Sequence, residues 1–108
     1  MTERVLAPSR SGSVVLDVGA GTGALVLHTP PGMDGREIEI SQISQNGRAD
    51  APRTHSRVRQ RWTAGRVRYA AVYPALAAGE YTVWGDPLTP VATVTVDGGR
   101  IASCHWPA

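Results

Sequence analysis

One stretch of the sequence decides the fold: Val14-Val15-Leu16-Asp17-Val18-Gly19-Ala20-Gly21-Thr22-Gly23. Alternating apolar side chains predict a strand over residues 13–18, with one buried face and Asp17 pointing outward. Glycines follow this strand at positions 19, 21 and 23. If a helix came next, the segment would belong to a parallel α/β fold. If a second strand came next, the glycines would connect two strands, so the residues after Gly23 fix the fold class.

This stretch resembles the first motif of S-adenosylmethionine-dependent methyltransferases. The resemblance implies a cofactor held by turn amides and a helix N-terminus, with Glu37 or Glu39 as the acidic residue that holds the ribose hydroxyls. However, only residues 24–29 precede Pro30-Pro31, and they are too few and too β-prone for a helix. Parallel strands also need crossovers of a dozen or more residues. We therefore predict a hairpin connection whose glycines adopt positive φ, and no methyl-donor site.

The length and composition limit the possible classes of protein. The 108 residues suit one domain with its own core. No run approaches the ~18 apolar residues that a membrane span needs, and the N-terminus lacks an apolar secretion segment. Cys104 is the only cysteine, which excludes an internal disulfide and suits the cytoplasm. All eleven basic residues are arginine, and the net charge of +2 is compatible with an acidic partner.

The remaining pattern predicts an all-β domain. Residues 1–12 are expected to be a flexible tail, and residues 13–108 a single sandwich with a mobile loop at 43–53. Alternation predicts strands over residues 24–29, 36–41, 80–84, 91–96 and 100–106, the last two forming a hairpin through Asp97-Gly98-Gly99. Ile38 and Ile40 should face inward and Glu37 and Glu39 outward. We expect an antiparallel β-sandwich of seven or eight strands.

A second hairpin, within residues 55–73, has a register that can be argued. A two-residue turn at Ala64-Gly65 places Thr63 opposite Arg66. One face then carries Val58, Gln60, Trp62, Val67, Tyr69, Ala71 and Tyr73. The other face carries Arg57, Arg59, Arg61, Arg66, Arg68, Ala70 and Val72. A slip of one residue would place charge in the core, which favours this register.

Residues 66–106 resemble prealbumin-like sandwich modules, which include the carboxypeptidase regulatory-like domains. The resemblance rests on Tyr73-Pro74-Ala75-Leu76-Ala77-Ala78-Gly79-Glu80-Tyr81-Thr82-Val83-Trp84 and on the valine-rich strand and glycine turn that follow. It implies a prealbumin-like, immunoglobulin-like fold, with Leu76 closing one end of the core and Tyr81 and Val83 facing inward. The whole chain is also similar to short uncharacterised proteins of high-GC Gram-positive bacteria. Prealbumin-like modules serve as stalks, accessory domains and binders, so the fold leaves function open.

The arginine face is the first candidate site. Arg57, Arg59, Arg61, Arg66 and Arg68 could dock the phosphates of a nucleic acid or an acidic protein. The alternative is a solvated face whose arginines pair with Glu37, Glu39 or Asp17.

Trp84 and Trp106 are the second candidate site. Trp84 alternates with Tyr81 and Val83, so it is expected outside the core. An exposed tryptophan pair would suggest self-association or a partner surface.

The soft metal ligands are His28, His55, His105 and Cys104, and their spacing is not that of a chelate. Cys104 and His105 should point to opposite faces of a strand. A site assembled in space from two histidines and a carboxylate remains an alternative.

We therefore expect a non-enzymatic, cytoplasmic binding or protein-interaction module with no catalytic residue, cofactor or metal. Its partner would be a protein or a second copy, giving a homodimer through a sheet edge or the tryptophans. The alternatives are a nucleic-acid or acidic-partner binder and, less favoured, a metal-dependent hydrolase-type or methyltransferase-like enzyme. No membrane partner is expected.

Overall fold

A computed structural model describes residues 5–6, 15–16, 18–45 and 52–107. Over these residues the chain forms ten strands and two short 3₁₀ helices. The strands are β1 (Val5–Leu6), β2 (Val15–Leu16), β3 (Thr22–Thr29), β4 (Glu37–Gln42), β5 (Thr54–Arg57), β6 (Arg59–Thr63), β7 (Arg66–Ala77), β8 (Gly79–Asp86), β9 (Thr89–Val96) and β10 (Ile101–His105). The 3₁₀ helices are η1 (Pro31–Met33) and η2 (Ile43–Gln45).

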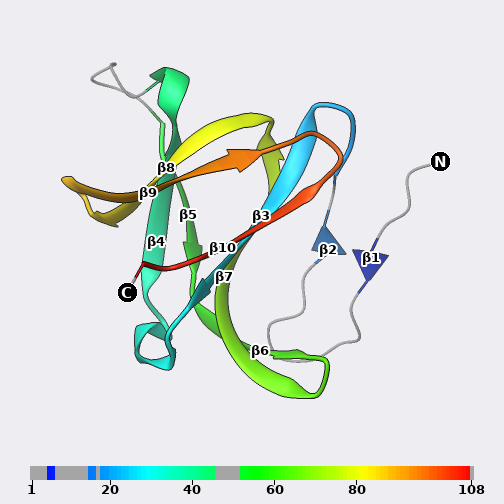
Figure 1. Ribbon diagram of the computed structural model, residues 1–108, viewed down its shortest axis with the longest axis vertical. Helices are drawn as coiled ribbons and strands as arrows, with labels where there is room; N and C mark the ends of the chain where they lie inside the picture. Colours follow the sequence, from blue (N-terminus) through cyan, green and yellow to red (C-terminus); the bar gives the residue numbers. More distant parts are fainter. Residues whose placement is uncertain (1–4, 7–14, 17, 46–51, 108) are drawn as a thin grey trace.

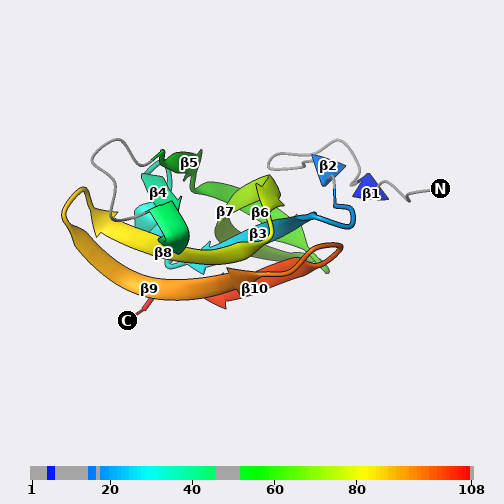
Figure 2. The same ribbon diagram turned by 90° about the horizontal axis from the view of Figure 1, so that it is seen from above.

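Eight of these strands form two sheets of four, packed face to face (Figures 1 and 2). We call the sheet of order β10-β3-β7-β6 sheet I, and the sheet of order β5-β4-β8-β9 sheet II. β1 and β2 pair separately, as a two-stranded ladder. The predicted all-β sandwich is confirmed, with one departure from the antiparallel pattern: β10 runs parallel to β3.

The core lies between the inner faces of the two sheets. Leu25, Leu27 and Tyr73 from sheet I meet Ile38 and Ile40 from sheet II, and each is at most 1% exposed. The inward direction of the two isoleucines is confirmed. Leu76, Tyr81 and Val83 are also buried, the positions that the resemblance implied for them.

The glycine stretch leads into a strand and not into a helix. The backbone of Gly19 pairs with that of Thr22 across a tight turn, and β3 begins at Thr22. The strand–turn–helix geometry of a methyl-donor site is therefore absent after Gly23, within the part of the chain that the structure describes. Val14 and Asp17 lie outside the described residues.

The expected role of these glycines was wrong in two respects. β2 pairs with β1, so the turn does not join two neighbouring strands. None of Gly19, Gly21 and Gly23 has positive φ. Gly23 instead permits a close approach of the loop after β9, because a Cβ on Gly23 would collide with the Asp97 carbonyl and would lie 3.0 Å from the Arg100 carbonyl.

The predicted hairpin of β9 and β10 is also wrong. β9 lies in sheet II beside β8, whereas β10 lies in sheet I beside β3. The loop between them crosses from one sheet to the other and is bound to the start of β3. The Gly99 amide donates to the Thr22 carbonyl at 3.0 Å, and the Ala24 amide donates to the Arg100 carbonyl at 3.0 Å.

The β6–β7 hairpin has the predicted register. Thr63 faces Arg66, Trp62 faces Val67 and Arg61 faces Arg68. Ala64 and Gly65 form the turn with φ of 52° and 74°, as a two-residue hairpin turn of type I′ requires.

We had expected one continuous strand through Val58, and this expectation was wrong. Val58 is fully buried, its amide donates to the Arg36 carbonyl, and its carbonyl accepts from the Gly35 amide. The chain therefore changes sheets here: β5 belongs to sheet II and β6 to sheet I.

The predicted tail and loop fall largely on residues that the structure does not describe. Residues 1–4 and 7–12 of the tail lie outside the described residues, and Val5–Leu6 form β1. Residues 46–51 of the expected mobile loop are also outside. Where the structure describes the chain, it contains no helix with the length and apolar character to cross a membrane.

Candidate functional site

Four of the five predicted arginines share one face of the β6–β7 hairpin. Arg59 and Arg61 come from β6, and Arg66 and Arg68 from β7. The register and the period of two place all four on the outer face of sheet I, opposite the buried Tyr73.

The four arginines differ in exposure. Arg59, Arg66 and Arg68 are exposed, whereas Arg61 is half-buried and its Nε donates to the Ala70 carbonyl at 3.0 Å. Burial, and secondarily Arg59, lowers the pKa of Arg61, which still remains charged at neutral pH.

Arg57 does not join this face. It lies on β5 in sheet II, where its Nη2 is 3.9 Å from Glu37 Oε2. Glu37 also lies 2.8 Å from Nδ1 of His55, and Glu39 accepts from Arg53 at 3.0 Å.

The glutamates considered as partners for the arginine face are thus engaged on the other sheet. Within the described ranges, no ion pair reaches Arg59, Arg66 or Arg68. Asp17, the third carboxylate considered, lies outside these ranges.

Two histidines join the arginines on the outer face of sheet I. The parallel pairing of β10 with β3 sets His105 beside His28, with ring centroids 4.9 Å apart and planes at 27°. His28 Nε2 lies 3.1 Å from Ser103 Oγ. Burial lowers the pKa of His28, with smaller contributions from His105 and Arg68. We call the set of Arg59, Arg61, Arg66, Arg68, His28 and His105 the cationic face.

The opposite side of the same hairpin is apolar and solvent-exposed. Trp62 and Val67 face one another and are 52% and 42% exposed. Trp62 and Val67 share the face that was predicted for them, but this end of the hairpin lies outside the core. Figure 1 shows the hairpin extending away from sheet II, so both of its sides meet solvent.

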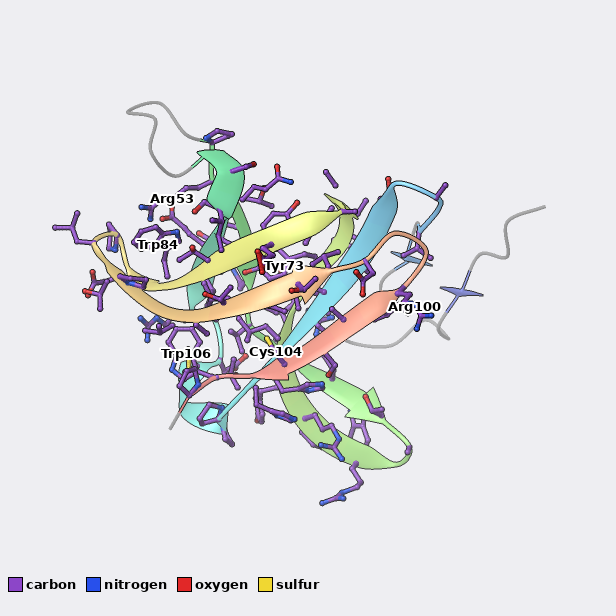
Figure 3. The ribbon with its side chains drawn as sticks, turned by 45° about the horizontal axis from the view of Figure 1, so that its top comes forward. Arg53, Tyr73, Trp84, Arg100, Cys104 and Trp106 are labelled. Carbon is purple, nitrogen blue, oxygen red and sulfur yellow. The ribbon has the colours of Figure 1, made fainter. Side chains whose placement is uncertain are left out.

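The two tryptophans proposed as one surface lie on different sheets (Figure 3). Trp84 is on the outer face of sheet II, where its Nε1 donates to Ser41 Oγ at 2.9 Å and the Arg53 guanidinium lies 3.9 Å from its ring centre. Its predicted position outside the core is confirmed. Trp106 follows β10, packs against the core and lies 5.5 Å from the Arg36 guanidinium.

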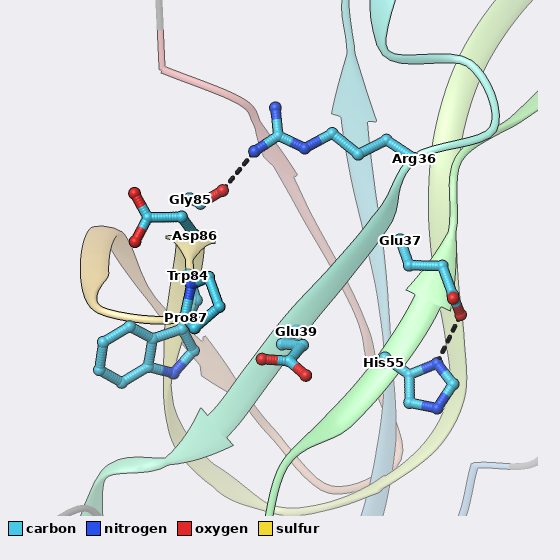
Figure 4. Close-up of a pocket in the computed structure, with 8 residues that line it drawn as sticks. All are labelled: Arg36, Glu37, Glu39, His55, Trp84, Gly85, Asp86 and Pro87. Carbon is cyan, nitrogen blue, oxygen red and sulfur yellow. Dashed lines mark hydrogen bonds and ion pairs between the residues drawn. The ribbon is translucent and has the colours of Figure 1, made fainter.

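A pocket of about 490 Å³ lies on the outer face of sheet II (Figure 4). Its charged side chains bind one another or the backbone. His55 pairs with Glu37, Arg36 donates to the Gly85 carbonyl, and Asp86 accepts from the Leu88 amide at 2.8 Å. This amide, and secondarily Thr89, lowers the pKa of Asp86. The mixture of signs, already paired, leaves little unbalanced charge for a ligand.

The four soft ligands separate into a pair and two single residues. His28 and His105 stack, but His55 lies on sheet II and Cys104 packs against the core. Burial raises the pKa of the Cys104 thiol, so the thiol form is favoured. Among the described residues, no three His, Cys, Asp or Glu side chains are placed to hold a metal ion.

The histidine pair is the feature that sequence reasoning missed. Neither histidine has a neighbour at chelating spacing, and only the pairing of two distant strands brings them together.

Comparisons with models of protein families, with curated proteins and with solved structures found no match to this chain. The fold and surface define its class as an all-β sandwich with a cationic outer face.

Proposed function

We propose that this chain is a non-enzymatic interaction module that binds an acidic partner protein through the β6–β7 hairpin. The observation that carries the proposal is the pair of exposed faces on this one hairpin. One face presents Arg59, Arg61, Arg66 and Arg68, and the other presents Trp62 and Val67. Arginine and tryptophan are the side chains most enriched at the energetic centres of protein interfaces.

The arrangement favours a protein over a nucleic acid. Single-stranded nucleic acids are bound by basic side chains that follow the backbone together with aromatic rings on which bases stack. Here Trp62 lies on the face opposite the arginines, and Tyr69 alternates with Arg68. A single strand therefore could not meet the arginines and these two rings on one surface. An acidic protein can meet the arginines alone, or clasp both sides of the hairpin.

Electrostatic attraction would act mainly on the association rate. Exposed ion pairs contribute about 0.2–1 kcal/mol each, so several contacts must act together. Unpaired surface charge also steers encounter and is screened by salt. Binding should therefore weaken as the salt concentration rises.

The test is the binding of a fluorescently labelled peptide rich in Asp and Glu, followed by anisotropy at low and at physiological salt. We expect the double variant Arg66→Glu/Arg68→Glu to weaken binding by about tenfold or more, because two exposed contacts of about 0.7 kcal/mol each correspond to that factor. Trp62→Ala tests whether the apolar face takes part.

Arg57→Glu/Arg53→Glu is the matched control, because it changes the net charge equally on sheet II. An equal loss in both double variants would reduce the effect to net charge and overturn the proposal. Tighter binding of an oligonucleotide than of the acidic peptide, with the same dependence on Arg66 and Arg68, would replace the acidic protein by a nucleic acid.

A further inference from the structure

A second pocket lies where β3 and β10 end and β7 continues beyond them. Its volume is about 390 Å³. It is lined by His28, Thr29, Pro30, Pro31, Val67, Arg68, Tyr69, His105 and Trp106. Unlike the pocket on sheet II, it has no carboxylate among these described lining residues. Among these lining residues, Arg68 is the one with a fixed charge.

His28 lines the wall of this pocket with a neutral imidazole. Its Nδ1 is buried and, among the described residues, has no hydrogen-bond partner. A proton on Nδ1 would be a buried donor without an acceptor, which is costly. We therefore assign the proton to Nε2, which donates to Ser103 Oγ at 3.1 Å. The lowered pKa of His28 agrees with this neutral tautomer.

His105 is the imidazole that a ligand can reach. It is exposed, whereas its stacking partner His28 is only half-exposed. His105 lines the pocket, and its stack with His28 limits the orientations of its ring. Arg68 adds a planar guanidinium with five N–H donors, and no carboxylate of the described chain lies within ion-pair distance of it.

These groups are donors that approach from two strands, β7 and β10. A guanidinium binds a phosphate through two parallel hydrogen bonds, and an imidazole can donate a third from another direction. A phosphoryl group offers three terminal oxygens and about two negative charges near neutral pH, whereas a carboxylate offers two oxygens and one charge. The pocket therefore suits a tetrahedral dianion better than a carboxylate.

We propose that this pocket binds a phosphate monoester, with Arg68 contacting two of its oxygens and His105 donating to a third. His28 and Ser103 position the His105 ring and do not touch the ligand. This inference rests on the proposed function in one respect: the monoester would be a phosphorylated side chain of the acidic partner.

The test uses small probes, so it does not depend on finding the partner. Phenyl phosphate, inorganic phosphate and benzoate are titrated separately, and the ring signals of His105 are followed by nuclear magnetic resonance. We expect phenyl phosphate to bind at least about fivefold more tightly than benzoate, since hydrogen bonds to the more highly charged group are stronger. Arg68→Gln should abolish this preference. Arg66→Gln should retain it, because Arg66 is on the same hairpin but does not line the pocket.

Four outcomes overturn the inference. The first three are equal binding of benzoate, a preference that survives Arg68→Gln, and an equal loss in the Arg66→Gln control. Tighter binding of inorganic phosphate than of the ester would overturn the monoester and identify the free ion. Because the acidic-peptide assay depends on Arg66 and this assay does not, failure of the pocket and failure of the proposed function give different results.

Discussion

Tyr73 is the residue whose hydroxyl joins the two sheets through the core. Its ring is 1% exposed in sheet I, and its hydroxyl donates to the Ile38 carbonyl of sheet II at 2.6 Å. Burial, with smaller effects of Cys104 and Glu39, raises the pKa of Tyr73, so the hydroxyl remains a donor. We expect Tyr73→Phe to lower the free energy of unfolding by about 1–3 kcal/mol, because a buried carbonyl loses its partner.

Urea denaturation followed by circular dichroism measures this loss. Tyr69→Phe is the matched control, since Tyr69 is only half-buried and its hydroxyl makes no hydrogen bond within the described chain. Its effect should stay within about 0.5 kcal/mol. Equal losses in the two variants would show that the contact between Tyr73 and Ile38 does not stabilise the fold.

His28 makes stability depend on pH. Burial, His105 and Arg68 lower its pKa from 6.5, so the unfolded chain takes up a proton at a higher pH than the folded chain does. The unfolded state then binds more protons, and stability rises with pH in this range. The contribution of His28 is complete above 6.5 and is lost as the pH falls through the lowered pKa.

Thermal unfolding between pH 7.5 and pH 5.5 tests this, with the flanking values chosen about one unit on each side of the ordinary histidine pKa. We expect the Tm of the native chain to fall more steeply than that of His28→Gln. Parallel curves would contradict the assigned burial of a neutral imidazole. His55→Gln provides the comparison, because His55 is exposed on sheet II and paired with Glu37.

At the scale of elements, the glycine turn and the loop after β9 hold the two sheets together. A Cβ on Gly23 would collide with the Asp97 carbonyl of this loop and would lie 3.0 Å from the Arg100 carbonyl, whereas nothing lies within 4 Å of a Cβ on Gly21. Gly23→Ala must displace the loop that donates from Gly99 to Thr22, and we expect a loss of about 1–3 kcal/mol. Gly21→Ala should be almost neutral. The measurement is the free energy of unfolding of each variant. Equal values for Gly23→Ala and Gly21→Ala would contradict the close packing at Gly23.

The sequence predicts most of the strands and one register, but not every choice of neighbour. Alternation placed Ile38 and Ile40 in the core, and the Ala64-Gly65 turn set Thr63 against Arg66. Both are local signals. The partner of a strand is not a local property, because an edge strand with alternating apolar residues can pair with either sheet. The turn signal at residues 97–99 therefore suggested a hairpin where the chain crosses between sheets.

The candidate site was predictable to the same extent. Four arginines followed from the register of one hairpin, whereas Arg57 was lost because the chain changes sheets at buried Val58. Val58 fits the alternation of apolar residues whether it belongs to a strand of sheet I or of sheet II. The sequence therefore does not indicate that the chain crosses between the sheets at this residue. The pairing of His28 with His105 depends on a parallel contact between distant strands, and such a contact has no local signature.

At the scale of the whole molecule, the four edge strands differ in how well they resist pairing with another chain. Each sheet has two edges: β10 and β6 in sheet I, and β5 and β9 in sheet II. β6 carries two arginines, and β5 has only four residues and carries an arginine. β10 carries no Arg, Lys, Asp or Glu but has only five residues. β9 has eight residues and none is charged. Charge and shortness are the usual protections of an edge, and β9 lacks both.

The expected self-association through a sheet edge is therefore best assigned to β9. Val91, Ala92 and Val94 are only half-buried on this strand, so a second copy would cover apolar surface as well as backbone groups. An antiparallel pairing of β9 with its own copy is self-complementary and gives a two-fold dimer.

We expect sedimentation velocity to show a dimer that forms with increasing concentration, and Thr93→Lys to remove it, because a charge on an exposed edge opposes its like across the two-fold axis. Thr54→Lys places the same charge on the β5 edge and should leave the dimer intact. A native chain that remains monomeric at every concentration, or an equal effect of the two lysines, would contradict the assignment to β9. Pro90 stands near the start of this strand and lacks an amide, so the paired segment should begin after it, at residues 91–96.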